Sequence, residues 1–95
     1  MKAIVSVIGK DKKGIIAKVS GALYDMDVNI EDISQTILQE YFTMIMAVEI
    51  CENAPRFDEI KSALNELGEK IGVQIQIQLK SIFDSMHSVS LSKNN

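Results

Sequence analysis

The sequence predicts an α+β fold in which one four-stranded antiparallel sheet carries two helices on one face. Along the chain, the hydrophobic period switches between strand and helix in the order β-α-β-β-α-β. The segment 73–80, VQIQIQLK, alternates apolar and polar residues throughout, as a half-buried antiparallel strand does. Segments 29–39 and 41–50 are close enough in sequence to pair only as an antiparallel hairpin. This order of elements is the ferredoxin-like, or split βαβ, arrangement.

The first half of the chain supplies a strand, a helix and the hairpin. Residues 3–8, AIVSVI, are apolar on both faces, which is typical of a central strand covered on both sides. From Gly14 the period becomes helical, and this helix is expected to end near Asp27. Its apolar stripe consists of Ile15, Ile16, Val19, Leu23 and Met26. The segment 29–39 mixes β-branched and polar residues and is predicted to be a half-exposed strand.

A second amphipathic helix is predicted from an apolar stripe formed by Phe57, Ile60, Leu64, Leu67 and Ile71. Asn53 and Pro55 are start signals, and Gly72 is a favoured terminator. Gly68 lies inside this helix, where glycine costs about 1 kcal/mol relative to alanine. Such a residue indicates close packing of the helix against the sheet.

Length and composition predict one small domain, 1–80, followed by a C-terminal extension, 81–95, with a short helix of one or two turns and a frayed end. The net charge of −3 argues against a general nucleic-acid partner. Neither a signal peptide nor an apolar run long enough for a membrane is present, so a cytoplasmic location is expected. The single cysteine, Cys51, cannot form an internal disulfide and is predicted to be a small buried apolar residue.

The stretch 7–16, VIGKDKKGII, raises the possibility of a phosphate-binding loop between a strand and a helix. A Walker loop needs Lys and Ser or Thr after its second glycine, whereas Ile15 and Ile16 follow Gly14. Acyl phosphatases of this topology need an arginine here, and the only arginine is Arg56. RNA-recognition domains need aromatic residues on both central strands, and the first strand has none.

Metal sites and catalytic sets are also not expected. Copper and zinc chaperones of this fold need a Cys-x-x-Cys pair, whereas Cys51 is the only cysteine in the sequence. An EF-hand-like spacing of acidic and amide side chains begins at Asp25, but its sixth position is Ile30 and its twelfth is Thr36. His87 has no acid–nucleophile constellation beside it and is expected at the surface. The sequence therefore predicts no enzyme, no metal and no cofactor.

A polar loop at a helix N-terminus is the feature that remains. Unpaired N–H groups and the helix dipole accept a carboxylate there as readily as a phosphate, and Gly14 permits close approach. Asp11 offers an acceptor for an ammonium group, and Asn29, fifteen residues after Gly14, is expected to return beside the loop. Together these groups suit an amino acid. The alternative is that Asp11 and Asn29 only cap the helix and the turn.

The segment GKDKKGIIAKVSGALYDMDVNIEDISQT resembles the opening of an ACT domain, and the expected βαββαβ order over residues 1–80 matches that family. Within that family, the chain resembles small stand-alone ACT proteins and the two-ACT regulator of the glycine cleavage system. The resemblance implies a regulatory module that binds an amino acid between paired domains. It carries over Asp11, Gly14 and Asn29 as ligand-binding positions, with the neighbours Ile15, Ile30 and Asp32.

The leading hypothesis is a non-catalytic homodimer that binds an amino acid or a similar small carboxylate and signals to a partner protein. Dimerisation is expected because the core is small and the sheet has only one helical layer. The alternative is a ligand-free dimerisation or protein-interaction module, supported by the alternating strand 73–80 and the apolar tail.

Overall fold

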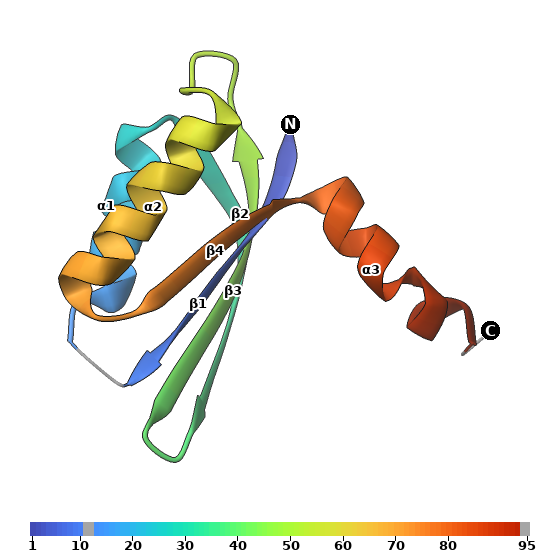
Figure 1. Cartoon of the computed structure of the whole chain (residues 1–95), viewed down its shortest axis with the longest axis horizontal. Coiled ribbons are helices and arrows are strands. Elements are labelled where there is room, and N and C mark those ends of the chain that lie inside the picture. Colours follow the sequence, from blue (N-terminus) through green and yellow to red (C-terminus); the bar gives the residue numbers. More distant parts are fainter. Residues whose placement is uncertain (11–12, 94–95) are drawn as a thin grey trace.

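The computed structural model describes residues 1–10 and 13–93, with side chains placed through residue 86. The described elements are β1 (Lys2–Lys10), α1 (Ile15–Asp25), β2 (Val28–Leu38), β3 (Tyr41–Ile50), α2 (Phe57–Ile71), β4 (Gln74–Leu79) and α3 (Lys80–Lys93). The strands form one antiparallel sheet in the order β2-β3-β1-β4. Helices α1 and α2 lie side by side on one face, while α3 projects away from the sheet (Figure 1). The predicted ferredoxin-like fold is confirmed.

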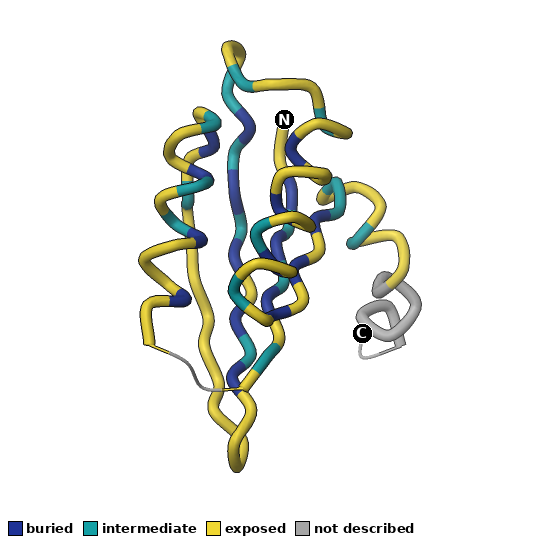
Figure 2. Tube along the Cα trace, turned by 60° about the vertical axis from the view of Figure 1, so that its left-hand side comes forward, coloured by how far each residue is buried: buried dark blue, intermediate teal, exposed yellow. Residues whose placement is uncertain are grey.

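The core lies between the sheet and the layer formed by α1 and α2. Alternate positions of β1 and β3 point toward the helices, and both strands carry side chains with no exposed surface there, such as Val5 and Met46. The helices contribute Leu23 from α1 and Ile60 and Leu64 from α2, each at most 1% exposed. Burying a side chain of this size contributes about 1.5–3 kcal/mol, so this layer holds the domain together. Figure 2 shows the same pattern, with buried residues on the inner sides of the two layers.

The end of α2 at Ile71 agrees with the predicted terminator Gly72, while its start at Phe57 lies just after the predicted signals Asn53 and Pro55. At the start, the backbone N–H of Arg56 donates to Glu59 Oε1 at 3.1 Å. At the end, Gly72 adopts the left-handed conformation with φ 78°, and its N–H donates to the carbonyl of Gly68 at 2.8 Å. A Cβ on Gly68 would lie 2.6 Å from the backbone oxygen of Val73. The predicted close packing at Gly68 is therefore confirmed.

Strand β2 is an edge strand with an irregularity near its start. It pairs with β3 from Val28 opposite Ile50 to Leu38 opposite Tyr41, but the register shifts between Ile30 and Asp32. Because of this bulge, Ile30 and Ile33 lie three residues apart in sequence but on the same face, toward the helices. All residues from 31 to 38 are exposed.

Several elements differ from their predicted limits. Helix α1 ends at Asp25 rather than near Asp27, which has φ 60° and forms the turn into β2. Strand β1 is central as predicted, but its second face is covered only in part, because α3 contacts β1 while Ile8 remains 47% exposed. Cys51 is half-buried rather than buried.

Helix α3 is longer than the predicted one or two turns and covers 14 residues. It begins directly after β4, and no glycine or proline interrupts the sequence between Lys80 and Lys93. The side chain of His87 lies outside the described part of α3. None of the helices among residues 1–10 and 13–93 has the length and apolarity that crossing a bilayer requires.

Candidate functional site

The N-terminus of α1 is the part of the predicted site that the structure describes most directly. Gly14 precedes the helix with φ 83° and ψ 2°, and its carbonyl accepts the N–H of Lys18 at 2.9 Å. Within the described chain, no side chain caps this end of α1, and the first turn contains no acidic residue. The first N–H groups of the helix therefore remain available, with the positive end of the helix dipole, to an anionic group.

A groove runs from this end of α1 along its contact with α2. It has a volume of about 730 Å³. Its lining includes the apolar Ile15 and Leu67 together with three lysines, Lys13, Lys18 and Lys70. The side chain of Ile15 is only 4% exposed and belongs to the core. Ile15 can thus offer a ligand its backbone N–H and a small edge of its side chain.

The remaining predicted residues lie together on the first half of β2. Asn29 is exposed and lies opposite Glu49 of β3, on the face away from the helices, while Ile30 is half-buried toward the helices. Asp32 is exposed, and its Oδ1 accepts the backbone N–H of Ile33 at 2.9 Å. This hydrogen bond stabilises the bulge in β2. A shallow hollow of about 650 Å³ includes Asn29 and Glu49 in its lining but not Gly14.

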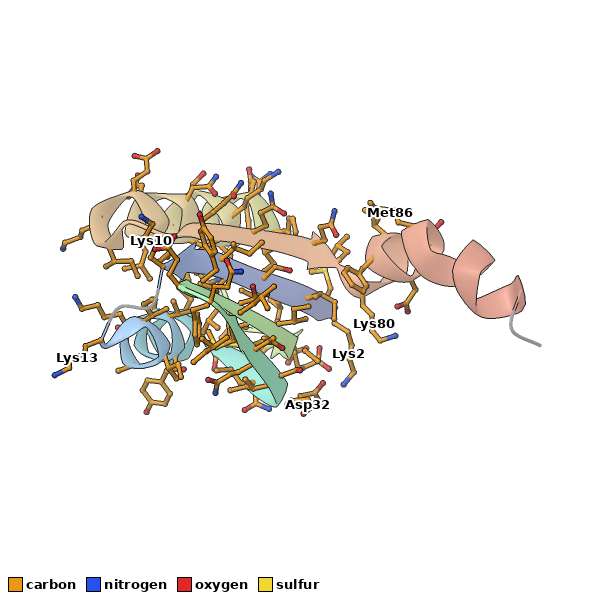
Figure 3. The ribbon with its side chains drawn as sticks, turned by 90° about the horizontal axis from the view of Figure 1, so that it is seen from below. Lys2, Lys10, Lys13, Asp32, Lys80 and Met86 are labelled. Carbon is orange, nitrogen blue, oxygen red and sulfur yellow. The ribbon has the colours of Figure 1, made fainter. Side chains whose placement is uncertain are left out.

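A single chain does not bring these two groups of residues together. Strand β1 ends at Lys10, which pairs with Tyr41, and Tyr41 pairs on its other side with Leu38 at the end of β2. Asn29 lies at the opposite end of the sheet. In Figure 3, Lys10 and Lys13 lie at one end of the domain, and Lys2 and Asp32 lie toward the other end.

The expected return of Asn29 beside the loop is therefore not met within one chain. Helix α1 is the physical reason, because it carries the backbone away from Gly14 before β2 begins. Asp11, the remaining predicted residue, lies outside the described residues.

A cluster of ion pairs ties three strands together near Asn29. Lys2 Nζ lies 2.7 Å from Glu31 Oε1 on β2 and 3.4 Å from Glu49 Oε1 on β3. The amino group of Met1 also donates to Glu49 Oε2. Sequence reasoning missed this cluster, because only the strand register brings residues 2, 31 and 49 together.

These contacts shift the titration of two groups. The hydrogen bond with Glu31 is the main cause that raises the pKa of Lys2 above 10.5. The hydrogen bond from the Met1 amino group is the main cause that lowers the pKa of Glu49 below 4.5. All three side chains reach solvent, so each pair contributes little to stability.

Replacing Glu49 with glutamine is expected to lower the melting temperature slightly at neutral pH. Because the folded-state pKa of Glu49 is lowered, its contribution is present above the unfolded value and is lost as pH falls through the folded value. Melting curves of the wild type and Glu49→Gln should therefore converge in strong acid. Glu66→Gln, at an exposed position of α2, serves as the control and should show no such convergence. A difference for Glu49→Gln that stays constant into strong acid would contradict this account.

Metal-binding chemistry finds no support in the described part of the chain. Among residues 1–10 and 13–93, no three His, Cys, Asp or Glu side chains gather as a metal ion would require. The chemistry that the α1 terminus offers is recognition of an anion by backbone N–H groups.

Comparison with known proteins finds a matching family model, similar sequences and similar solved structures. The family model described as ACT domain matches residues 2–78. A UPF0237 protein of Clostridium acetobutylicum is 57% identical over 89 residues, which cover 94% of this chain and 100% of the relative. An ACT domain protein from Streptococcus pneumoniae has a similar structure, with a TM-score of 0.79 and 44% identity over 88% of this chain and 94% of its own. The regulatory subunit of aspartate kinase from Thermus thermophilus, in a ligand-free form, matches with a TM-score of 0.63 and 25% identity, over 81% of this chain and 50% of its own.

Proposed function

Because this chain belongs to the ACT domain family, a family of regulatory modules that bind small ligands, we propose that it is a non-catalytic sensor of a small carboxylate. The ligand is an amino acid or a close analogue, bound at the interface of a homodimer, and its binding is transmitted to a partner protein. The observation that carries the proposal is the N-terminus of α1, which begins at a left-handed Gly14 and has no side-chain cap in the described chain.

The ligand would use its two charged ends differently. Its carboxylate would accept the backbone N–H groups that follow Gly14, where the helix dipole also favours negative charge. Its ammonium group would donate to Asp11, which stands three residues before Gly14 in the sequence. The amide of Asn29 offers both a donor and an acceptor, but within one chain it lies too far along the sheet.

A second copy paired along β2 would supply the missing amide. Helix α1 has 11 residues and rises about 16 Å, a distance that a strand covers in about five residues. Counted from Val28, this places Gly14 level with about Ile33 of β2. An antiparallel pairing of two β2 edges, centred near Glu31, would bring Asn29 of the partner subunit to that level. Each interface would then hold two equivalent sites.

Calorimetric titration of the whole chain with each common amino acid tests ligand binding. We expect heat for one or a few of them and a rise in melting temperature at saturation. Asn29→Ala should weaken binding by about tenfold or more, since the loss of one hydrogen bond to a charged group costs about 1.5–3 kcal/mol. Asn65→Ala, at an exposed position of α2, should bind as the wild type does. The absence of both heat and thermal shift at millimolar concentrations of every amino acid would refute the proposal.

Mixing two defective variants tests whether the site is shared between subunits. Neither Gly14→Val nor Asn29→Ala alone should bind with full affinity. A mixed dimer has one interface site with both defects and one with neither, so the mixture should regain sites of wild-type affinity. If both defects belonged to a site within one chain, the mixture would regain none.

A ligand-free interaction module is the second candidate, and the exposed apolar side chains of α3 favour it. Ile82 and Met86 are 51% and 64% exposed. In this case Asp11→Ala and Asn29→Ala would leave binding of the partner protein unchanged, and no amino acid would bind. Loss of partner binding in both variants would instead favour the sensor.

A further inference from the structure

The sheet face away from α1 and α2, which we name the open face, is uncovered within the described chain except where α3 contacts β1 and β4. Ile45 of β3 lies at its centre, opposite Ser6 of β1, and is 42% exposed. Ile8 of β1 is 47% exposed and lies between Thr43 and Gln74. Its charged residues stand toward the ends of the strands, as Lys2 and Lys10 do. The centre of the open face is therefore neutral and partly apolar.

Helix α3 presents a second uncovered apolar surface. It projects away from the rest of the molecule (Figure 1), and its Ile82 and Met86 are 51% and 64% exposed. Met86 Sδ lies 3.8 Å from the side-chain nitrogen of Gln78, a residue of the open face. Met86, labelled in Figure 3, is therefore directed to the same side of the sheet as the open face.

The composition of α3 matches a neutral surface. Among residues 81–92, Asp84 is the only Asp, Glu, Lys or Arg, and its carboxylate pairs with Lys80 at 2.5 Å. A helix that stands alone in water normally carries charges around most of its surface. The serine-rich and apolar sequence of α3 is instead suited to contact with another neutral, partly apolar surface.

The chain's own geometry limits how much of its own sheet α3 can cover, although the helix contacts β1 and β4. Strand β4 ends at Leu79 and α3 begins at Lys80, so no connecting residue is available for the helix to turn back. The length of α3 nevertheless suits the open face. Its 14 residues rise about 21 Å, more than the roughly 14 Å between the outer strands of a four-stranded sheet with strands about 4.8 Å apart, so the helix can cross the whole face.

We propose that α3 of one protomer packs across the open face of a second copy, which returns its own α3 in the same way. The two open faces then face each other across a two-fold axis. Ile82 and Met86 of each copy lie against the region around Ile45 and Ile8 of the other. This contact does not involve the β2 edge or the α1 terminus. It can therefore be tested separately from the proposed ligand site.

Disulfide trapping between differently tagged chains tests the contact, with Cys51→Ser in every chain. One chain carries Ile45→Cys and the other Met86→Cys. Under mild oxidation we expect a covalent heterodimer as the main product. The control pairs Ile45→Cys with Asn65→Cys, because Asn65 lies on α2, on the other side of the sheet. A yield of heterodimer no higher than in the control overturns the proposal.

Light scattering provides a second measurement on chains without added cysteines. Met86→Asp should halve the mass of the assembly, because it places a charge on the neutral open face. Ile82→Asp should do the same, and both variants should stay folded since the two side chains are exposed in the single chain. Asn65→Asp adds the same charge elsewhere and should leave the mass unchanged. An unchanged mass for both α3 variants would disprove the contact, whether or not an amino acid binds.

Discussion

Replacing Gly68 with alanine should destabilise the domain by about 1–3 kcal/mol, although alanine is the better helix former. The added Cβ would lie 2.6 Å from the backbone oxygen of Val73 and 3.4 Å from the side chain of Ile75. Backbone cannot move aside as a flexible side chain does. The same segment is fixed by hydrogen bonds from the N–H groups of Gly72 and Val73 to the Gly68 carbonyl. Helix α2 would therefore have to separate from β4.

Replacing Gly21 with alanine should have the opposite effect on the stability of the domain. Gly21 lies inside α1, and a Cβ there would meet no atom within 4 Å. Gly21→Ala should stabilise the domain by about 0.5–1 kcal/mol through lower backbone entropy in the unfolded chain. Urea unfolding of Gly68→Ala, Gly21→Ala and the wild type measures the change in unfolding free energy for each substitution. Equal shifts of the same sign would show that α2 does not pack against β4 as closely as described.

Replacing Gly14 with alanine should cost about 1–2 kcal/mol, because a residue with a Cβ must then adopt the left-handed conformation. Steric contact with neighbours contributes nothing to this cost. The nearest atom to an added Cβ is Cε of Lys18, at 3.9 Å. If alanine relieves the strain by leaving the left-handed region, the first N–H groups of α1 change direction, and affinity for a carboxylate should fall as well.

Replacing Gly14 with asparagine tests whether the left-handed backbone conformation causes the loss of stability. Asn tolerates positive φ better than other residues, so Gly14→Asn should be less destabilised than Gly14→Ala. Thermal unfolding, with Lys13→Ala as the control at the preceding position, measures the difference. Equal losses in the Ala and Asn variants would indicate that the left-handed conformation at Gly14 is not the source of the cost.

Local signals explain how much of the fold could be predicted from the sequence. The limits of α2 follow from the apolar stripe and from Gly72, which the structure shows in the expected left-handed conformation. The hairpin follows from the short separation of its strands. Helix α3 is longer than predicted, because the serine-rich sequence gives little helical signal although nothing in it terminates a helix.

The candidate site could be predicted only in part, because topology rather than sequence distance decides where its two groups of residues lie. The glycine at the start of α1 has a local signature. The position of Asn29 relative to it depends on the direction of α1. The ion pairs of Lys2 with Glu31 and Glu49 depend in the same way on the strand register.

The bulge near the start of β2 also bears on how far assembly can proceed. An exposed edge strand with Ile33, Ile37 and Leu38 at its surface is a template on which further chains can add, and regular edges of this kind support fibril growth. The shift between Ile30 and Asp32 interrupts the regular spacing of hydrogen-bonding groups along that edge. We therefore expect the bulge to favour one closed pairing between two copies over the open-ended addition of strands.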